Sequence, residues 1–307
     1  MPSSVILKAE GSSKPLQSSL LPSIFFLLLA SVASVAYGQA HPWQRIISIG
    51  GSLTEIIYAL GAQESLVAVD ATSYYPPEAS QRFPNVGYMR TLSAEPILSL
   101  NPDLIIASSD AGPPQTLDQL RAAGTNVVMI PDFPSMQGLY DKIDIVAELL
   151  GRQLQGAALI AGIREQYAQA AILIDSIDSR PSALFLLSIG SGAPMAAGSA
   201  TSADAMITMA GGRNALAAIQ GFRPVSPEAI VATAPEYIII PQRTLDTYGS
   251  VDNFLQIPEL AGTPAAQTKN LLVFDNLFLI GFGPRTVEAV LKLASQLHSG
   301  FSTTGLD

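Results

Sequence analysis

The chain has 307 residues, of which 48% are hydrophobic and 13% are charged, so it is long enough to form two domains with well-filled cores. Its 25 acidic residues outnumber its 16 basic residues, and the formal charge of −9 argues against nucleic acid or an anionic membrane surface as a partner. The absence of cysteine excludes disulfides, thiolate metal sites, cysteine nucleophiles and a lipid-modified N-terminal cysteine.

The N-terminal segment has the pattern of an export signal. Two lysines precede an apolar stretch that runs from Leu20 to Ala36 and ends in small residues. A retained membrane anchor is the competing interpretation, but Pro22 interrupts the stretch, and a spanning helix needs roughly 20 apolar residues. We expect residues 1–40 to be a signal peptide and the exported product to begin near His41.

Short β-branched runs then alternate with helical stretches, a pattern that predicts buried parallel strands separated by helices. The expected strands are residues 45–49, 66–70, 103–107 and 126–130, followed by 182–187, 237–240 and 271–274. Between the two sets, residues 153–178 form a helical pattern about 26 residues and roughly 39 Å long. The expected fold class is therefore α/β, with two similar Rossmann-like lobes joined by one long rigid helix. The expected domains are an N-terminal lobe at 41–150, an interdomain helix at 151–180 and a C-terminal lobe at 181–307.

The first helix has a sequence signature at its start. Ser52 and Glu55 have the spacing of a capping box after two glycines, and the apolar pattern that follows ends at Gly61. A glycine turn before a helix can cradle a phosphate, but the third glycine and the lysine of nucleotide-binding motifs are absent. We interpret the segment as ordinary α/β turn chemistry.

An internal repeat supports two similar lobes, because residues 226–239 match residues 93–106 at a constant offset. Each copy has a serine at a helix N-cap, a glutamate in the first helical turn, a proline, an acidic residue and then a strand. The two glutamates are Glu95 and Glu228. The alternative to a shared function for them is that each only complements a helix dipole.

Tyr88 and Arg90 are a candidate pair for binding a metal. A phenolate is a better ligand of ferric iron than a neutral phenol, and a nearby guanidinium favours the charged form. Residues i and i+2 of an extended segment point to the same side, so Arg90 is placed to reach the phenol oxygen. On this spacing alone, a half-buried loop tyrosine beside a solvated arginine remains an open alternative.

The segment from Gly87 to Arg90, with support from Met195 to Gly198 and from Gly281 to Arg285, resembles the periplasmic haem-binding proteins of bacterial haemin ABC importers. These proteins form part of a larger group that binds cobalamin, siderophores and metals. The segments from Ile47 to Glu55 and from Ala210 to Asn214 resemble the pattern of that group. The resemblance extends from about residue 45 to the end of the chain.

The resemblance implies that Tyr88 coordinates ferric haem b, the transported ligand, in a cleft between the lobes, while Arg90 hydrogen-bonds the phenolate. Tyr74 and Tyr75 are candidates for contacts with the ring, and Met195 for a weak neighbour from the second lobe. Ordinary packing remains an open alternative for these three side chains.

Some members of the family add a histidine ligand, and here the sequence departs from them. Its histidines are His41, near the expected mature terminus, and His298, which we interpret as a cation at a helix end. We therefore expect an iron with tyrosine as its protein ligand and no histidine.

The resemblance also implies that Glu95 and Glu228 dock onto an ABC permease dimer in the inner membrane. The sequence thus predicts a monomeric, non-enzymatic carrier in the periplasm. The same fold carrying cobalamin or a ferric siderophore is the closest alternative. A secreted hydrolase or a zinc carrier would need a histidine near a serine, or clustered histidines and carboxylates, and two distant histidines do not supply these.

Overall fold

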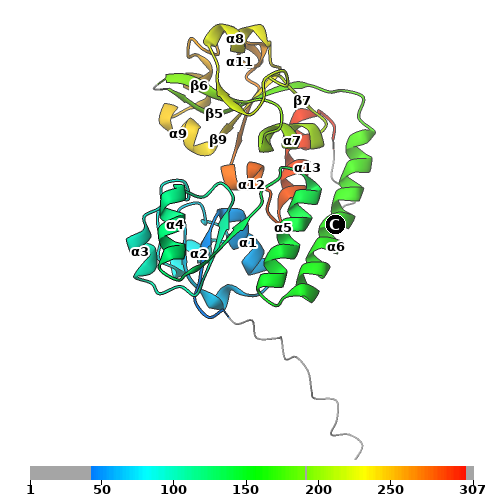
Figure 1. The fold of residues 1–307 in the computed structure, drawn as a ribbon. Helices are drawn as coiled ribbons and strands as arrows, with labels where there is room; N and C mark the ends of the chain where they lie inside the picture. The colour runs from blue at the N-terminus through cyan, green and yellow to red at the C-terminus, as the bar shows by residue number, and fades with distance from the viewer. Residues whose placement is uncertain (1–42, 191, 302–307) are drawn as a thin grey trace, which may run out of the picture. The chain divides into compact units, whose positions relative to one another are not determined.

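The computed structural model describes residues 43–190 and 192–301, and these contain two β-sheets built from different halves of the sequence (Figure 1). We call the half with the first sheet the N-terminal lobe and the half with the second sheet the C-terminal lobe. The predicted signal peptide and His41 lie outside the described residues. Within the described ranges, no helix combines the length and the apolar character needed to cross a membrane.

The N-terminal lobe contains a four-stranded, fully parallel sheet with the order β2-β1-β3-β4. Its strands are β1 (Ile46–Ile49), β2 (Leu66–Val69), β3 (Leu104–Ser108) and β4 (Asn126–Ile130). Its helices are α1 (Gly51–Ala59), the 3₁₀ turn η1 (Gln63–Ser65), α2 (Pro77–Arg82), α3 (Ala94–Leu98), α4 (Pro114–Ala122) and α5 (Met136–Leu149). Because all four strands run in one direction, the loops that follow them meet at one edge of the sheet, where α/β proteins bind ligands.

The C-terminal lobe has a mixed sheet with the order β10-β9-β5-β6-β8, and a short strand, β7, also pairs with β5. Strands β5, β9 and β10 are parallel, whereas β6 and β8 extend the sheet in antiparallel fashion. The strands are β5 (Ser182–Gly190), β6 (Gly192–Ala197), β7 (Arg213–Asn214), β8 (Phe222–Pro224), β9 (Tyr237–Pro241) and β10 (Leu271–Phe274). The helices are α7 (Ser202–Met209), α8 (Pro227–Ala232), α9 (Gln242–Tyr248), α10 (Val251–Leu255), α11 (Pro264–Thr268), α12 (Asn276–Ile280) and α13 (Thr286–Leu297).

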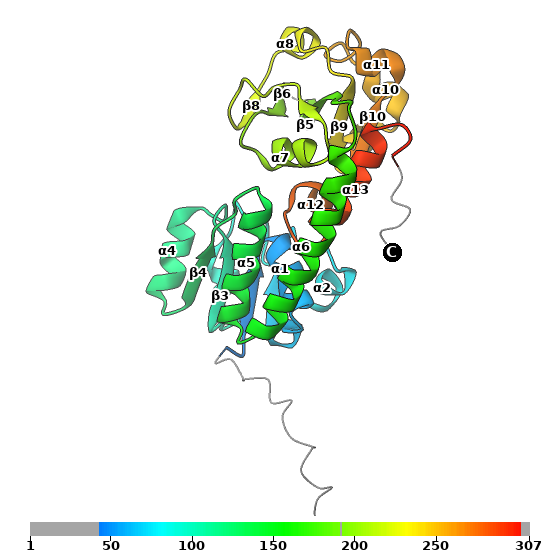
Figure 2. The same cartoon turned by 90° about the vertical axis from the view of Figure 1, so that its right-hand side faces the viewer.

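One long helix, α6 (Gln153–Asp175), joins the two lobes and packs on α5 and α13 (Figure 2). Its 23 residues correspond to about 34 Å, so it ends three residues earlier than the sequence predicts. Ile163 lies in the core of the N-terminal lobe, and Ile174 lies in a core of the C-terminal lobe. The expected α/β architecture with a connecting helix is confirmed.

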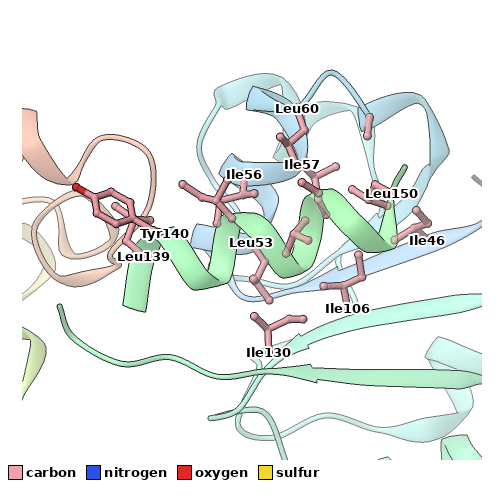
Figure 3. Packing of buried hydrophobic residues seen from close by; sticks show 14 of the residues in the cluster. Ile46, Leu53, Ile56, Ile57, Leu60, Ile106, Ile130, Leu139, Tyr140 and Leu150 are labelled. Carbon is pink, nitrogen blue, oxygen red and sulfur yellow. The ribbon is translucent and has the colours of Figure 1, made fainter. Parts of the chain in front are cut away.

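The core of the N-terminal lobe forms where α1 meets α5 and the sheet (Figure 3). The apolar residues of α1 have the spacing of one helical face, and they are Leu53, Ile56, Ile57 and Leu60. They pack against a set from α5 and the strands that includes Leu139, Leu150, Ile46, Ile106 and Ile130. This packing fixes α1, and with it Glu55, against the sheet.

The predicted capping box at the start of α1 is wrong. The N-cap is Gly50, whose φ of 122° favours glycine, and no side chain caps the helix. Glu55 cannot reach back to the helix start, because its buried carboxylate accepts hydrogen bonds from Arg285 of the C-terminal lobe. A side chain that the local pattern assigns to capping therefore joins the two lobes.

The internal repeat is visible in the backbone and in its hydrogen bonds. The copies place α3 before β3 and α8 before β9. At equivalent positions, the Asp103 carboxylate accepts from the Arg45 N–H at 3.1 Å, and the Glu236 carboxylate accepts from the Ser182 N–H at 2.8 Å. The acidic residue before each strand thus ties that strand to the start of its neighbour, β1 or β5.

Candidate ligand-binding site

Tyr88 lies in a loop that is tied to the carboxyl-terminal edge of the first sheet on both sides. The Ala71 N–H donates to the Gly87 carbonyl, and the Gly112 N–H donates to the Met89 carbonyl, each at 2.8 Å. Ala71 follows β2 and Gly112 follows β3, so the loop lies across the ends of these strands. Tyr88 is 45% exposed, which means that a fixed backbone presents its phenol ring to the surroundings.

Arg90 forms an ion pair with Asp110, with 2.6 Å between Nη2 and Oδ2. Both side chains are about half exposed. A guanidinium has five N–H donors, so this pair leaves donors free for a second acceptor. Asp110 is absent from the sequence-based candidates, although an acidic residue three positions after a predicted strand at the ligand edge of an α/β fold was a usable signal.

Exposed aromatic side chains gather at this edge of the sheet. Among the described residues, those that are large and exposed include Tyr74, Tyr75, Tyr88 and Phe133, and all four lie in segments at the carboxyl ends of β2, β3 or β4. Phe133, which follows β4, is 64% exposed and is absent from the sequence-based candidates. A group of exposed rings at a ligand edge is typical of a binding surface for a flat apolar molecule.

Tyr74 and Tyr75 contact the C-terminal lobe while remaining partly exposed. The Tyr74 phenol oxygen accepts the Leu277 N–H at 2.9 Å, and the Tyr75 ring centroid lies 3.4 Å from the central carbon of the Arg285 guanidinium. Burial raises the pKa of Tyr74 to about 12, and the hydrogen bond from Leu277 opposes that rise. Both tyrosines therefore lie at the junction between the lobes.

A bidentate ion pair between Arg285 and Glu55 also crosses this junction. Arg285 donates from Nε to Glu55 Oε2 at 2.9 Å and from Nη2 to Oε1 at 2.7 Å. Burial raises the pKa of Glu55, although the hydrogen bonds and charge of Arg285 act against the rise. Burial alone would lower the pKa of Arg285, but the hydrogen bonds and charge of Glu55 raise it.

A buried lysine supplies a further tie between the lobes. Lys142 of α5 is 1% exposed, and its Nζ lies 2.6 Å from the Asp132 carboxylate. The same Nζ donates to the carbonyl oxygen of Phe282 at 3.0 Å. The motif from Gly281 to Arg285, which supports the family resemblance, thus contacts both α1 and α5.

Met195 and His298, the other side chains considered for the iron, lie in the C-terminal lobe. Met195 is half-buried in β6, where it pairs with Ser188 and Pro224. His298 is the C-cap residue of α13, as the sequence predicts, and its buried ring donates from Nε2 to the Ala210 carbonyl at 3.0 Å. Its Nδ1 makes no hydrogen bond with any of the described residues.

Glu95 and Glu228 are exposed in the first turns of α3 and α8. The Ser226 hydroxyl accepts from the Ala229 N–H at 3.2 Å, which confirms the predicted cap of α8, whereas Ser93 makes no such bond. Hydrogen bonds from its own backbone N–H and from Ser226 lower the pKa of Glu228.

Glu95 lines an open hollow of about 710 Å³ between α3 and α4. The other residues of its wall are Leu92, Ser93, Ala94, Leu98, Ser99, Thr116 and Gln119. Within residues 43–190 and 192–301, no group of three or more histidine or acidic side chains could hold a metal ion.

Two lobes with parallel-stranded cores and one connecting helix define a class of proteins that bind solutes. The chain belongs to the periplasmic binding protein family, which matches residues 46–276. The predicted resemblance to periplasmic binding proteins is thereby confirmed.

Solved structures and curated proteins add relatives with known ligands. The periplasmic haem-binding protein RhuT of Roseiflexus sp. RS-1, solved in its apo form, is 43% identical with a TM-score of 0.79, covering 83% of this chain and 97% of that chain. The haem-binding protein BhuT, solved with two haems, is 37% identical with a TM-score of 0.78, covering 82% and 97%. The cobalamin-binding protein of Halobacterium salinarum is 27% identical over 263 residues, which cover 83% of this chain and 70% of that protein.

Proposed function

We propose that this protein is a non-enzymatic periplasmic carrier that captures haem and delivers it to an ABC-type haemin importer. The observation that carries the proposal is the presentation of Tyr88, whose loop is tied on both sides to the edge where α/β folds bind ligands. The similarity to haem-binding proteins of known structure supports haem over other solutes. In this proposal the signal peptide at residues 1–40 directs a monomer to the periplasm.

The proposed site binds haem in two ways, by coordinating the iron and by contacting the porphyrin ring. The Tyr88 phenolate coordinates ferric iron, and Arg90 donates to the phenolate oxygen while Asp110 pairs with the same guanidinium. Tyr74 and Tyr75 border the ring from the N-terminal lobe, and Met195 borders it from the C-terminal lobe. The haem b is cargo, so its binding requires no reaction.

Cobalamin is the second candidate ligand, because curated relatives bind it. A corrinoid carries its own equatorial and lower axial ligands and has no need of an exposed phenol beside a guanidinium. Mixing the mature protein separately with haemin and with cobalamin, followed by equilibrium dialysis, distinguishes the two ligands. Retention of cobalamin but not haemin would replace the proposed function by the second one.

The first prediction concerns the metal bond. We expect haemin to give a high-spin ferric spectrum with the mature protein, and Tyr88→Phe, which removes only the phenol oxygen, to abolish that spectrum. Tyr167→Phe on α6 is the matched control and should leave the spectrum unchanged. A wild-type spectrum in Tyr88→Phe would remove Tyr88 from the mechanism.

Docking onto the importer is proposed to use Glu95 and Glu228. The two carboxylates are exposed at equivalent positions of the repeat, which suits two copies of one receptor surface in a permease dimer. The hollow beside Glu95 offers room for a basic side chain of the partner.

The second prediction tests this surface. In cells that depend on haem uptake, the double variant Glu95→Arg, Glu228→Arg should lose uptake, because both contacts become repulsive, while haemin affinity stays unchanged. The control is Glu148→Arg, Glu165→Arg, which changes the net charge equally at exposed positions on α5 and α6. Loss of haemin affinity in the first variant would place these glutamates in the ligand site instead.

A further inference from the structure

Phe133 is an exposed phenylalanine at the edge of the sheet that the proposed site uses. It follows β4, which is the parallel neighbour of β3, and β3 leads into Asp110, the partner of Arg90. The Ser109 N–H also donates to the Ile130 carbonyl at 2.9 Å, so the two loops leave the sheet side by side. Neighbouring strands are about 4.8 Å apart, so the loop after β4 begins close to the loop that contains Asp110.

The backbone at Phe133 is fixed although its side chain is exposed. The Ser135 N–H donates to the Phe133 carbonyl at 2.8 Å, and the Ser135 hydroxyl caps α5 by accepting from Gly138. A Cβ on Gly138 would lie 2.3 Å from the Phe133 carbonyl oxygen, so glycine allows helix and loop to approach this closely. Asp132 is held by the buried ammonium of Lys142 at 2.6 Å.

The fixed loop also lies beside the C-terminal lobe. Lys142 holds Asp132 with the same Nζ that donates to Phe282, a buried residue in a core of the C-terminal lobe. Asp132, the residue before Phe133, and Phe282 therefore contact the same ammonium group at the junction of the lobes. A ring whose backbone is already fixed loses only its side-chain rotamer freedom on contact with a ligand.

We propose that Phe133 stacks on the flat ring of the ligand and that the Lys142–Asp132 pair positions it. This inference rests on the proposed function and adds a ring contact that does not involve the iron. Phe133 therefore contributes to affinity for any porphyrin, with or without metal, whereas Tyr88 contributes only when iron is present.

The test compares haemin with iron-free protoporphyrin IX by fluorescence or absorbance titration. Phe133→Ala should weaken the binding of both ligands by a similar factor of about tenfold, and Phe133→Trp should bind both within about twofold of wild type. Tyr88→Phe should weaken haemin binding and leave protoporphyrin binding unchanged. Leu154→Ala, which truncates a side chain that is 85% exposed on α6, is the control and should change neither.

A double-mutant cycle tests the positioning role. Asp132→Asn keeps an acceptor for Lys142 but removes its charge, and it should weaken porphyrin binding in the wild-type background and have no further effect in Phe133→Ala. Equal effects of Asp132→Asn in both backgrounds would overturn the positioning role. Wild-type protein that binds neither porphyrin would refute the proposed function itself, whereas unchanged protoporphyrin affinity in Phe133→Ala would overturn only the stacking contact.

Discussion

Tyr74 lies at the proposed ligand edge of the first sheet and also hydrogen-bonds to the C-terminal lobe. Its phenol oxygen accepts the backbone N–H of Leu277, and its pKa rises from an ordinary value of 10.0 to about 12, chiefly through burial. Ionisation of this phenol therefore opposes folding, since the unfolded chain gives up the proton at a lower pH than the folded protein does.

The third prediction follows from that difference. The folded pKa lies above the unfolded one, so the stability linked to Tyr74 is present below about pH 10 and is lost as the pH rises towards about 12. Urea unfolding at pH 9, 10 and 11 should show that the free energy of unfolding falls more steeply for wild type than for Tyr74→Phe. The other tyrosines are common to both proteins, and parallel curves for the two would contradict the assignment.

At the scale of single residues, the sequence can point to candidates whose partners lie nearby or whose pattern is repeated. Tyr88 and Arg90 are two positions apart, and the equivalent glutamates stand out because the repeat shows them twice. Glu55 was misassigned because its partner, Arg285, is 230 residues away. Phe133 was missed because an isolated phenylalanine after a strand has the same pattern whether it is buried or exposed.

At the scale of elements, α6 contains two glycines in opposite environments. Gly156 is buried, and a Cβ there would lie 2.5 Å from the Cβ of Ala147 on α5. Gly162 is exposed, and a Cβ there would meet no atom within 4 Å. The first glycine allows α5 and α6 to pack closely, whereas the second only lowers helix propensity.

The fourth prediction uses this pair within one helix. Gly156→Ala should lower the free energy of unfolding by about 1–3 kcal/mol, because the added methyl group forces the two helices apart. Gly162→Ala should raise it by about 0.5–1 kcal/mol, because alanine favours the helix. Thermal and urea unfolding would measure both, and a loss of stability in both variants would show that α6 is not packed as described.

The parallel strands of the N-terminal lobe were predicted to within one residue at each end, because buried strands between helices have continuous β-branched runs. Strands β6 and β8 were not predicted. They contain glycine, alanine or proline, residues with little preference for strands, and their pairing with β5 and with each other stabilises them.

At the scale of the whole molecule, the two lobes are connected by more than α6. The Glu55–Arg285 pair, the Lys142–Phe282 hydrogen bond and the Tyr74–Leu277 hydrogen bond all cross between them. Several independent ties of this kind resist hinge motion, so we expect ligand binding to change the relative position of the lobes very little.

The fifth prediction measures one of these ties. Glu55→Ala should lower the free energy of unfolding by about 3 kcal/mol, because it leaves the mostly buried Arg285 guanidinium without its partner. Glu64→Ala is the control, since it breaks the exposed Arg82–Glu64 pair and should change stability by less than about 1 kcal/mol. Similar losses in both variants would mean that the interlobe pair adds no more than a surface pair.

The two contacts of Lys142 couple the Phe133 loop to the junction of the lobes. Its ammonium group pairs with Asp132, directly before Phe133, and donates to the main-chain carbonyl of Phe282. A partner that separates the lobes at Phe282 would break one of the two contacts of that ammonium and loosen the segment that holds Asp132 and Phe133. Separation of the lobes and release of the proposed ligand would then be coupled.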